Sequence, residues 1–216
     1  MAWSSPNTAK PPRSKRTGSW WPWVAAPTAT TSVSPWPLAS GHLLVDAARR
    51  TANPAVLALG DLTAGPALAH KAMAEADVAA ATAAGKRAAF DPRAVPAVVF
   101  CDPEIITVGL TVEGARAEGF DADSARFPLS ASGRALTNGG ALGFVELVTD
   151  RSDGTILGGH GVGPAVSELA GELALAIEMG ATAQDMALTI HPHPTLSEAI
   201  GEAAWVALRR PLHTTP

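Results

Sequence analysis

Residues 155–182 read TILGGHGVGPAVSELAGELALAIEMGAT, and the order of elements within this stretch sets the fold class. An apolar run predicts a strand at 155–162, and the apolar spacing that follows predicts a helix over 165–179. An Asp-Gly pair precedes the strand, and this pair is a strong hairpin signal that leads back to a strand expected at 142–149. The stretch therefore predicts neighbouring antiparallel strands with a helix after them.

Further elements on both sides of this stretch keep strands and helices apart. Earlier strands are expected at 97–101, 106–110 and 124–128, with a short helix at 111–118 after a threonine cap. Later helices are expected at 183–188 and 195–208. Hairpin-joined strands with helices gathered at one end of the sequence predict an α+β fold, an antiparallel sheet flanked by helices.

The segment 41–93 has a different pattern, a strand followed by one long, alanine-rich helix. The expected elements are strands at 43–45 and 56–59 and a helix from Pro66 to about residue 84. Gly60 and Asp61 follow the second strand, and Gly85 closes the helix. The small side chains of this helix predict close packing against a neighbour. We therefore divide the chain into residues 1–40, 41–93 and 94–216.

The composition bounds the functional classes. With 216 residues and 47% hydrophobic content, the chain can build one domain, or one and a part. No apolar run approaches the roughly 20 residues of a membrane span. The net charge of -4 gives no reason to expect nucleic-acid binding. The single cysteine, Cys101, argues against a disulfide-stapled secreted fold, so we expect a cytoplasmic protein and a buried structural thiol.

Residues 1–40 are anomalous in composition. They hold five of the six tryptophans, seven prolines, four basic residues and no acid, without helical or strand periodicity. A targeting peptide and a disordered arm are two interpretations. A third is translation out of frame, because in a displaced frame, with GC-rich third codon positions, residues 19–34 can be read as roughly VVAVGRRPNSDDLGL. Sequencing the gene tests this third interpretation, which fails if no upstream frame encodes further domains.

Residues 191–204, HPHPTLSEAIGEAA, hold the pattern that points most directly to chemistry. His193 lies between two prolines, and Glu198 is placed to bind its ring. An imidazole held by a carboxylate is the arrangement of a general acid–base. Thr195 and Glu198 also have capping-box spacing, so Glu198 alternatively satisfies only a backbone N–H. The peptide bond between His193 and Pro194 is a candidate cis bond.

Two other patterns suggest ligands more weakly. His191 and His193 point the same way on an extended segment and could bind zinc, but no third ligand is conveniently spaced, so we expect no metal site. The run 158–163 has the spacing G-x-x-G-x-G, the reverse of a dinucleotide fingerprint. We interpret this run as a strand-to-helix turn.

Four segments together resemble the dihydrolipoamide dehydrogenases, in the FAD-dependent pyridine nucleotide-disulfide oxidoreductase family. The segments are 56–76, 94–111, 155–182 and 191–204, and they follow the family's order and spacing. The resemblance covers roughly residues 41–208. HPTLSE favours this group over glutathione reductases, and the C-terminal tail lacks the cysteine pair of mercuric reductases.

The resemblance implies roles for particular residues. His193 would be the acid–base for disulfide exchange, with Glu198 as its orienting partner, while His191 flanks the site. Asp61 would bind the ribityl chain of FAD, with the backbone of residues 67–70 against the flavin's pyrimidine edge. The implied cofactor-binding residues are Gly60, Asp61, Ala67, Leu68, Ala69, His70 and Pro194.

The resemblance also implies what the chain lacks. Family members are usually more than twice as long, and they carry a glycine-rich turn for FAD, a redox cysteine pair and a second turn for NAD. We therefore expect the C-terminal part of a dihydrolipoyl dehydrogenase, a remnant of the FAD-binding domain followed by the dimerisation domain. We expect this part to be inactive alone and not to retain the parent's FAD. The parent would pass electrons from a dihydrolipoyl group through a disulfide and FAD to NAD.

The expected partners follow from the same resemblance. They are a second copy or a full-length relative, and, for the parent, the lipoyl domain of an acyltransferase complex. In the family the histidine loop reaches across the dimer into the partner's disulfide and flavin. One alternative is a non-catalytic dimerisation module that pairs with a full-length relative. Another is a fragment of a mercuric or other disulfide reductase.

Overall fold

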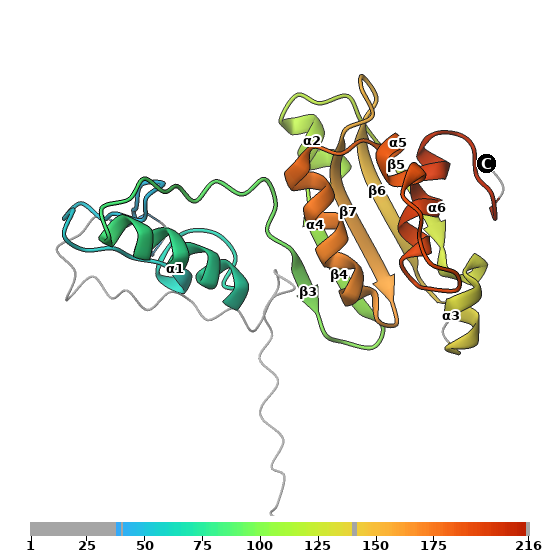
Figure 1. The fold of residues 1–216 in the computed structure, drawn as a ribbon, viewed down its shortest axis with the longest axis horizontal. Coiled ribbons are helices and arrows are strands. Elements are labelled where there is room, and N and C mark those ends of the chain that lie inside the picture. Colours follow the sequence, from blue (N-terminus) through green and yellow to red (C-terminus); the bar gives the residue numbers. More distant parts are fainter. Residues whose placement is uncertain (1–37, 40, 140–141, 215–216) are drawn as a thin grey trace, which may run out of the picture.

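The fold is given by a computed structural model that describes residues 38–39, 41–139 and 142–214. The interpretations of residues 1–37 and 40 lie outside the described residues. Figure 1 shows a five-stranded sheet covered by helices, with a smaller helical unit beyond the edge formed by β3. In these described ranges, no helix is both long and apolar enough to cross a membrane.

The sheet is antiparallel throughout, in the order β3-β4-β7-β6-β5. The strands are β3 (Ala97–Val99), β4 (Glu104–Gly109), β5 (Ala122–Pro128), β6 (Phe144–Asp150) and β7 (Ile156–Gly163). The hairpin between β6 and β7 turns at Gly154, whose φ is +80°. These observations confirm the predicted antiparallel α+β class.

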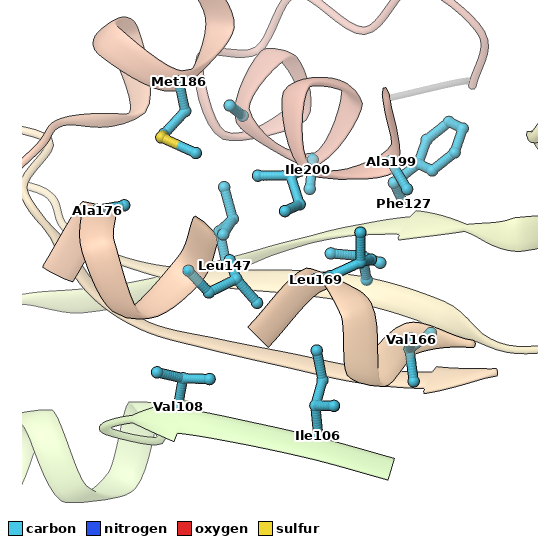
Figure 2. Close-up of a cluster of buried hydrophobic side chains, with 14 of the residues drawn as sticks. Ile106, Val108, Phe127, Leu147, Val166, Leu169, Ala176, Met186, Ala199 and Ile200 are labelled. Carbon is cyan, nitrogen blue, oxygen red and sulfur yellow. The ribbon is translucent and has the colours of Figure 1, made fainter. Parts of the chain in front are cut away.

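Three helices and a short 3₁₀ turn cover one face of the sheet. They are η3 (Val166–Leu169), α4 (Ala170–Met179), α5 (Ala183–Leu188) and α6 (Glu198–Ala207). Figure 2 shows Ile106 and Leu147 of the sheet meeting Leu169 and Ile200 from these helical segments, in a core that excludes water. The last helix begins later than its predicted start at residue 195, because residues 195–197 form a turn before it.

Smaller elements complete the domain. α2 (Val112–Ala117) begins at Thr111, whose hydroxyl accepts a hydrogen bond from the Gly114 N–H, as the sequence predicted. Its Ala115 packs with Val148 in a second, small core. The turn η2 (Leu129–Ala131) and helix α3 (Gly133–Thr137) were not expected from the sequence.

The unit before the sheet differs from the prediction in its strands and in the start of its helix. It contains β1 (Leu38–Ala39), β2 (His42–Leu43), the turn η1 (Gly60–Leu62) and α1 (Ala69–Ala83). The strand expected at 56–59 is wrong, because only Leu57 forms a bridge there, to Arg50. α1 starts three residues after Pro66, because Leu68 is still extended, and it ends before Gly85, whose φ is +73°.

The glycine run 158–163 lies within β7, so its interpretation as a strand-to-helix turn is wrong. A Cβ atom added at Gly158 would lie 2.0 Å from the Leu110 carbonyl oxygen. One added at Gly159 would lie 2.7 Å from the side chain of Leu173 on α4. These glycines therefore serve close packing inside a central strand.

The expected burial of Cys101 is also wrong, because the thiol is exposed. β3 ends at Val99, and the chain leaves the sheet before Cys101. An edge strand has a neighbour on one side only, so residues just beyond its end are not enclosed. Phe100, next to Cys101, is likewise 80% exposed.

We predict that Gly158→Ala lowers the free energy of unfolding by about 2 kcal/mol, because its methyl group would overlap backbone that cannot move aside. The matched control is Gly171→Ala on α4, where an added Cβ has nothing within 4 Å. Alanine there should stabilise by roughly 0.5–1 kcal/mol, as expected in a helix. Urea unfolding of both variants measures the difference, and equal stabilities would contradict the packing argument.

Candidate functional site

The histidine loop before α6 holds an imidazole–carboxylate pair. His193 Nδ1 lies 2.8 Å from Glu198 Oε1. The imidazole is 78% exposed, whereas Glu198 is only 30% exposed. The His193–Pro194 bond is cis, as the sequence suggested. The predicted pair is therefore brought together at the surface, with a carboxylate that is partly withdrawn from solvent.

Glu198 also satisfies the backbone, so both interpretations of its spacing hold. Its second oxygen accepts a hydrogen bond from the Thr195 N–H at 2.8 Å. The reciprocal half of a capping box is not formed, because the Thr195 hydroxyl donates to the Pro192 carbonyl oxygen instead. Glu198 thus fixes the imidazole and the loop that carries it at the same time.

The environment of Glu198 favours its ionised form. Partial burial raises the pKa of this carboxyl, but the hydrogen bonds from the Thr195 N–H and His193 lower it. Electrostatic attraction to the nearby rings of His193 and His191 adds to this effect, and the net result is a lowered pKa of Glu198. At neutral pH Glu198 is therefore a carboxylate that can accept a hydrogen bond from an imidazole.

His191 anchors the loop to the helices behind it. Its Nε2 lies 2.8 Å from Glu172 Oε1 on α4, and its side chain is only 9% exposed. The hydrogen bond to Glu172 is the main cause of its raised pKa. A Cβ added at Gly201 would lie 2.9 Å from His191 Nδ1, so α6 also packs closely on this ring.

The rings of His191 and His193 point in different directions, because His191 binds Glu172 on α4 and His193 binds Glu198 on α6. The expectation that they point the same way is therefore wrong. Within the described ranges, no group of three or more His, Cys, Asp or Glu residues is arranged to hold a metal ion.

A cavity of about 300 Å³ adjoins the pair. His193 and Glu198 line it together with Phe127 of β5, residues of α3, and a second pair, Glu202 and His213. Glu202 Oε1 lies 2.7 Å from His213 Nδ1. The spacing of Glu198 and Glu202 on one helix face was a signal that sequence reasoning missed. No comparable signal indicated Glu172 or His213.

The predicted flavin-contacting residues lie in the unit before the sheet. Asp61 is exposed on the turn η1, directly after Gly60. Ala67 and Ala69 are exposed, and Leu68, the residue before α1, makes no side-chain cap hydrogen bond. His70 Nε2 forms a hydrogen bond with the Pro96 carbonyl oxygen at 2.7 Å, which ties this end of α1 to the start of β3.

The two groups of predicted residues lie at opposite edges of the sheet. The flavin-contacting segment is linked to the β3 edge through His70. α6, which carries Glu198, packs on β5 and β6 at the other edge (Figure 1). Four strand spacings of ~4.8 Å separate β3 from β5, or about 19 Å. A single chain therefore does not bring the two groups into one site.

Comparison with known proteins now places the domain. Residues 95–204 match the family model described as pyridine nucleotide-disulphide oxidoreductase, dimerisation domain. The chain belongs to this family.

The similar proteins agree with this assignment. Dihydrolipoyl dehydrogenase of Halobacterium salinarum is 57% identical over 174 residues, which are 81% of this chain and 37% of that protein. The Geobacillus stearothermophilus enzyme of the same name is 50% identical over 80% of the chain and 37% of its own length. The chain thus spans less than two-fifths of these relatives.

Solved structures show the same fold. The crystal structure of LpdA from Mycobacterium tuberculosis has a TM-score of 0.72 and 33% identity, covering 79% of this chain and 38% of that one. The flavoprotein disulfide reductase RclA of Escherichia coli has a TM-score of 0.68 and 25% identity, covering 76% of this chain and 38% of its own. The predicted family and fold are therefore confirmed.

The His191–Glu172 contact predicts a pH-dependent stability. The raised pKa of His191 means that its protonated form is favoured in the folded chain. The resulting stabilisation is fully present below the unfolded pKa of about 6.5 and is lost as the pH rises through the higher folded value. In His191→Gln and Glu172→Gln, the decline in unfolding free energy from mildly acidic to mildly alkaline pH should shrink.

Denaturant unfolding across that pH range measures this decline. Glu168→Gln is the control, because Glu168 is an exposed acid of η3 next to α4. The control should keep the full pH dependence. If His191→Gln keeps it as well, the contact with Glu172 does not set the titration.

Proposed function

We propose that this chain is the C-terminal part of a dihydrolipoyl dehydrogenase, in which His193 is the acid–base that serves a dithiol in another subunit's half of the site. The observation that carries the proposal is the contact of 2.8 Å between His193 and Glu198 on an exposed loop. The named relatives and the residues of HPTLSE support it.

The proposal implies a direction of proton transfer. Glu198 as a carboxylate accepts the Nδ1–H of His193, so the lone pair of the imidazole is on Nε2. This exposed nitrogen takes a proton from a dihydrolipoyl thiol, which leaves the thiolate that disulfide exchange requires. The neighbouring carboxylate stabilises the imidazolium until the proton is returned.

The flavin-contacting segment fits one part of FAD. The exposed Asp61 carboxylate could accept hydrogen bonds from ribityl hydroxyls. The start of α1, where the Leu68 side chain makes no cap hydrogen bond, would offer N–H groups and partial positive charge to the ring's pyrimidine edge. Gly60 and residues 67–70 would form this contact, with Pro194 approaching from the partner. Bound FAD would supply electron transfer between the disulfide and NAD in the parent enzyme.

Dimerisation is a chemical requirement in this proposal. The acid–base and the flavin-contacting segment lie at opposite edges of one sheet, so a second subunit has to bring its loop to the flavin half. A groove of about 440 Å³ beside His191 offers an apolar surface for this contact. Leu175, Met179 and Ile190 line it, and they are 63%, 73% and 95% exposed.

The partner is a second copy or a full-length relative, and the parent would act in the cytoplasm on the lipoyl domain of an acyltransferase complex. A second candidate function is a non-catalytic module that pairs with a full-length relative. The observation that favours this alternative is the apolar groove beside His191, because such a module needs only a docking surface.

His193→Gln tests the acid–base role in a hybrid enzyme. Residues 41–214 would replace the corresponding part of the Halobacterium salinarum relative. Removing the proton acceptor should lower the rate of dihydrolipoamide oxidation by about a hundredfold or more. His213→Gln is the control, since it removes an imidazole from the same cavity without touching Glu198. Similar rates in both variants would rule out the assigned role.

Sedimentation velocity tests the dimer. At micromolar concentration the chain should sediment as a dimer, and Leu175→Glu should shift it towards monomer, because a charge would then face an apolar partner surface. Leu44→Glu, on the smaller unit, introduces the same charge at an exposed leucine and should leave the dimer intact. A monomeric unmodified chain would count against the proposal, and added full-length relative would then test the pairing module.

A further inference from the structure

A buried cluster of charges lies directly behind the turn that carries Asp61. Glu75 of α1 is fully buried, and its Oε1 lies 2.8 Å from Arg49 Nη1 and 3.1 Å from Lys71 Nζ. Arg49 and Lys71 are themselves buried. Two cations thus face one carboxylate, and the cluster has a net positive charge.

The cluster binds both backbone groups of Gly60. Glu75 Oε2 accepts the Gly60 N–H, and Lys71 Nζ donates to the Gly60 carbonyl oxygen at 3.2 Å. Lys71 also donates to the Thr63 hydroxyl at 3.3 Å. That hydroxyl in turn donates to the Gly60 carbonyl oxygen at 2.9 Å. The residue before Asp61 is therefore held from both sides by side chains of α1 and by Thr63.

The backbone around Asp61 is fitted closely to the same helix. Gly60 has a φ of +67°, and a Cβ added there would lie 3.3 Å from the Cβ of Ala72. Gly65 has a φ of +106°, and a Cβ added there would lie 2.9 Å from Lys71 Cε. The loop before and after Asp61 thus rests on α1, and glycine permits both the approach and the left-handed backbone.

Stability alone is a poor explanation for such a cluster. Burying charges is costly, and apolar side chains of similar volume often stabilise a protein as well or better. Arg49 Nε is also buried with no hydrogen-bond partner in the described part of the chain, which adds a cost. Apolar residues could not form hydrogen bonds with the N–H and C=O groups of Gly60, as Glu75 and Lys71 do.

We propose that Lys71 and Glu75 are positioning residues that fix the Gly60–Leu62 turn, so that the Asp61 carboxylate is held towards the ribityl hydroxyls of a flavin. The inference rests on the proposed flavin contact for its ligand, and on the cluster's geometry for the positioning. The two residues have opposite charges, so a role in positioning predicts the same effect from losing either one. A role through charge alone predicts opposite effects.

The test is amide hydrogen exchange by NMR in the full chain. Glu75→Gln removes the negative charge of the carboxylate that accepts the hydrogen bond from the Gly60 N–H. Lys71→Met removes the ammonium group and keeps an apolar side chain of similar length. In both variants the Gly60 and Thr63 amides should exchange about tenfold faster or more, the effect of weakening a hydrogen bond to a charged group. Helix amides of α1, such as that of Ala79, should keep their protection.

Asp77→Asn is the matched control, since it removes an exposed carboxylate from the same helix. It should leave the Gly60 and Thr63 amides unchanged. If Glu75→Gln unfolds α1, Lys71→Met decides. The inference is overturned if Lys71→Met leaves both turn amides as slow as in the control. It is also overturned if the helix amides speed up as much as those of the turn, which indicates a structural role only.

Titration with riboflavin 5′-phosphate, followed by quenching of its fluorescence, separates the two proposals. Positioning predicts weaker binding in both Lys71→Met and Glu75→Gln. Opposite changes in the two variants would show that charge governs the ligand and would overturn positioning. No binding by the unmodified chain would contradict the proposed flavin contact, while the exchange result would still decide whether the turn is held by α1.

Discussion

The lack of side chains at Gly158 and Gly159 in β7 is the constraint on which the candidate site depends. Gly159 leaves room for Leu173, so α4 lies directly on the sheet. From that position Glu172, the residue before Leu173, holds His191. His191 fixes the loop in which His193 meets its own glutamate. A side chain in the centre of the sheet would therefore displace a loop that it does not touch, because α4 transmits the shift.

The loop that carries the His193–Glu198 pair is held by two kinds of contact with different consequences. His191 and Glu172 are mostly withdrawn from solvent, and they anchor the loop without facing a substrate. His193 is exposed, and only its Nδ1 side is held by Glu198. The loop is thus held at His191, whereas the His193 ring remains exposed to solvent. The proposed proton exchange with a second subunit would need this combination, because positioning and access are separate requirements.

Sequence reasoning reached the fold and the main pair because these leave local signals. The hairpin turn, the strand periodicity and the spacing of His193 and Glu198 are all properties of neighbouring residues. Contacts across the fold leave no such signal, and for this reason Glu172 was missed as the partner of His191. Cys101 was misjudged because an apolar run does not reveal where an edge strand releases the chain. The glycines of β7 were misread because turns and close packing select the same residue.

The burial of the charged cluster behind Asp61 also could not be predicted from the sequence. Lys71 and Glu75 have the spacing of an ordinary surface ion pair, which contributes little to stability. Their burial comes from a turn folded over the helix, which no local pattern encodes. Each half-site is consequently built inside its own unit, the turn by α1 and the imidazole by α4 and α6. In the proposed dimer, the distance between the turn and the imidazole would therefore depend on how two subunits dock, and the docking surface would affect the proposed chemistry directly.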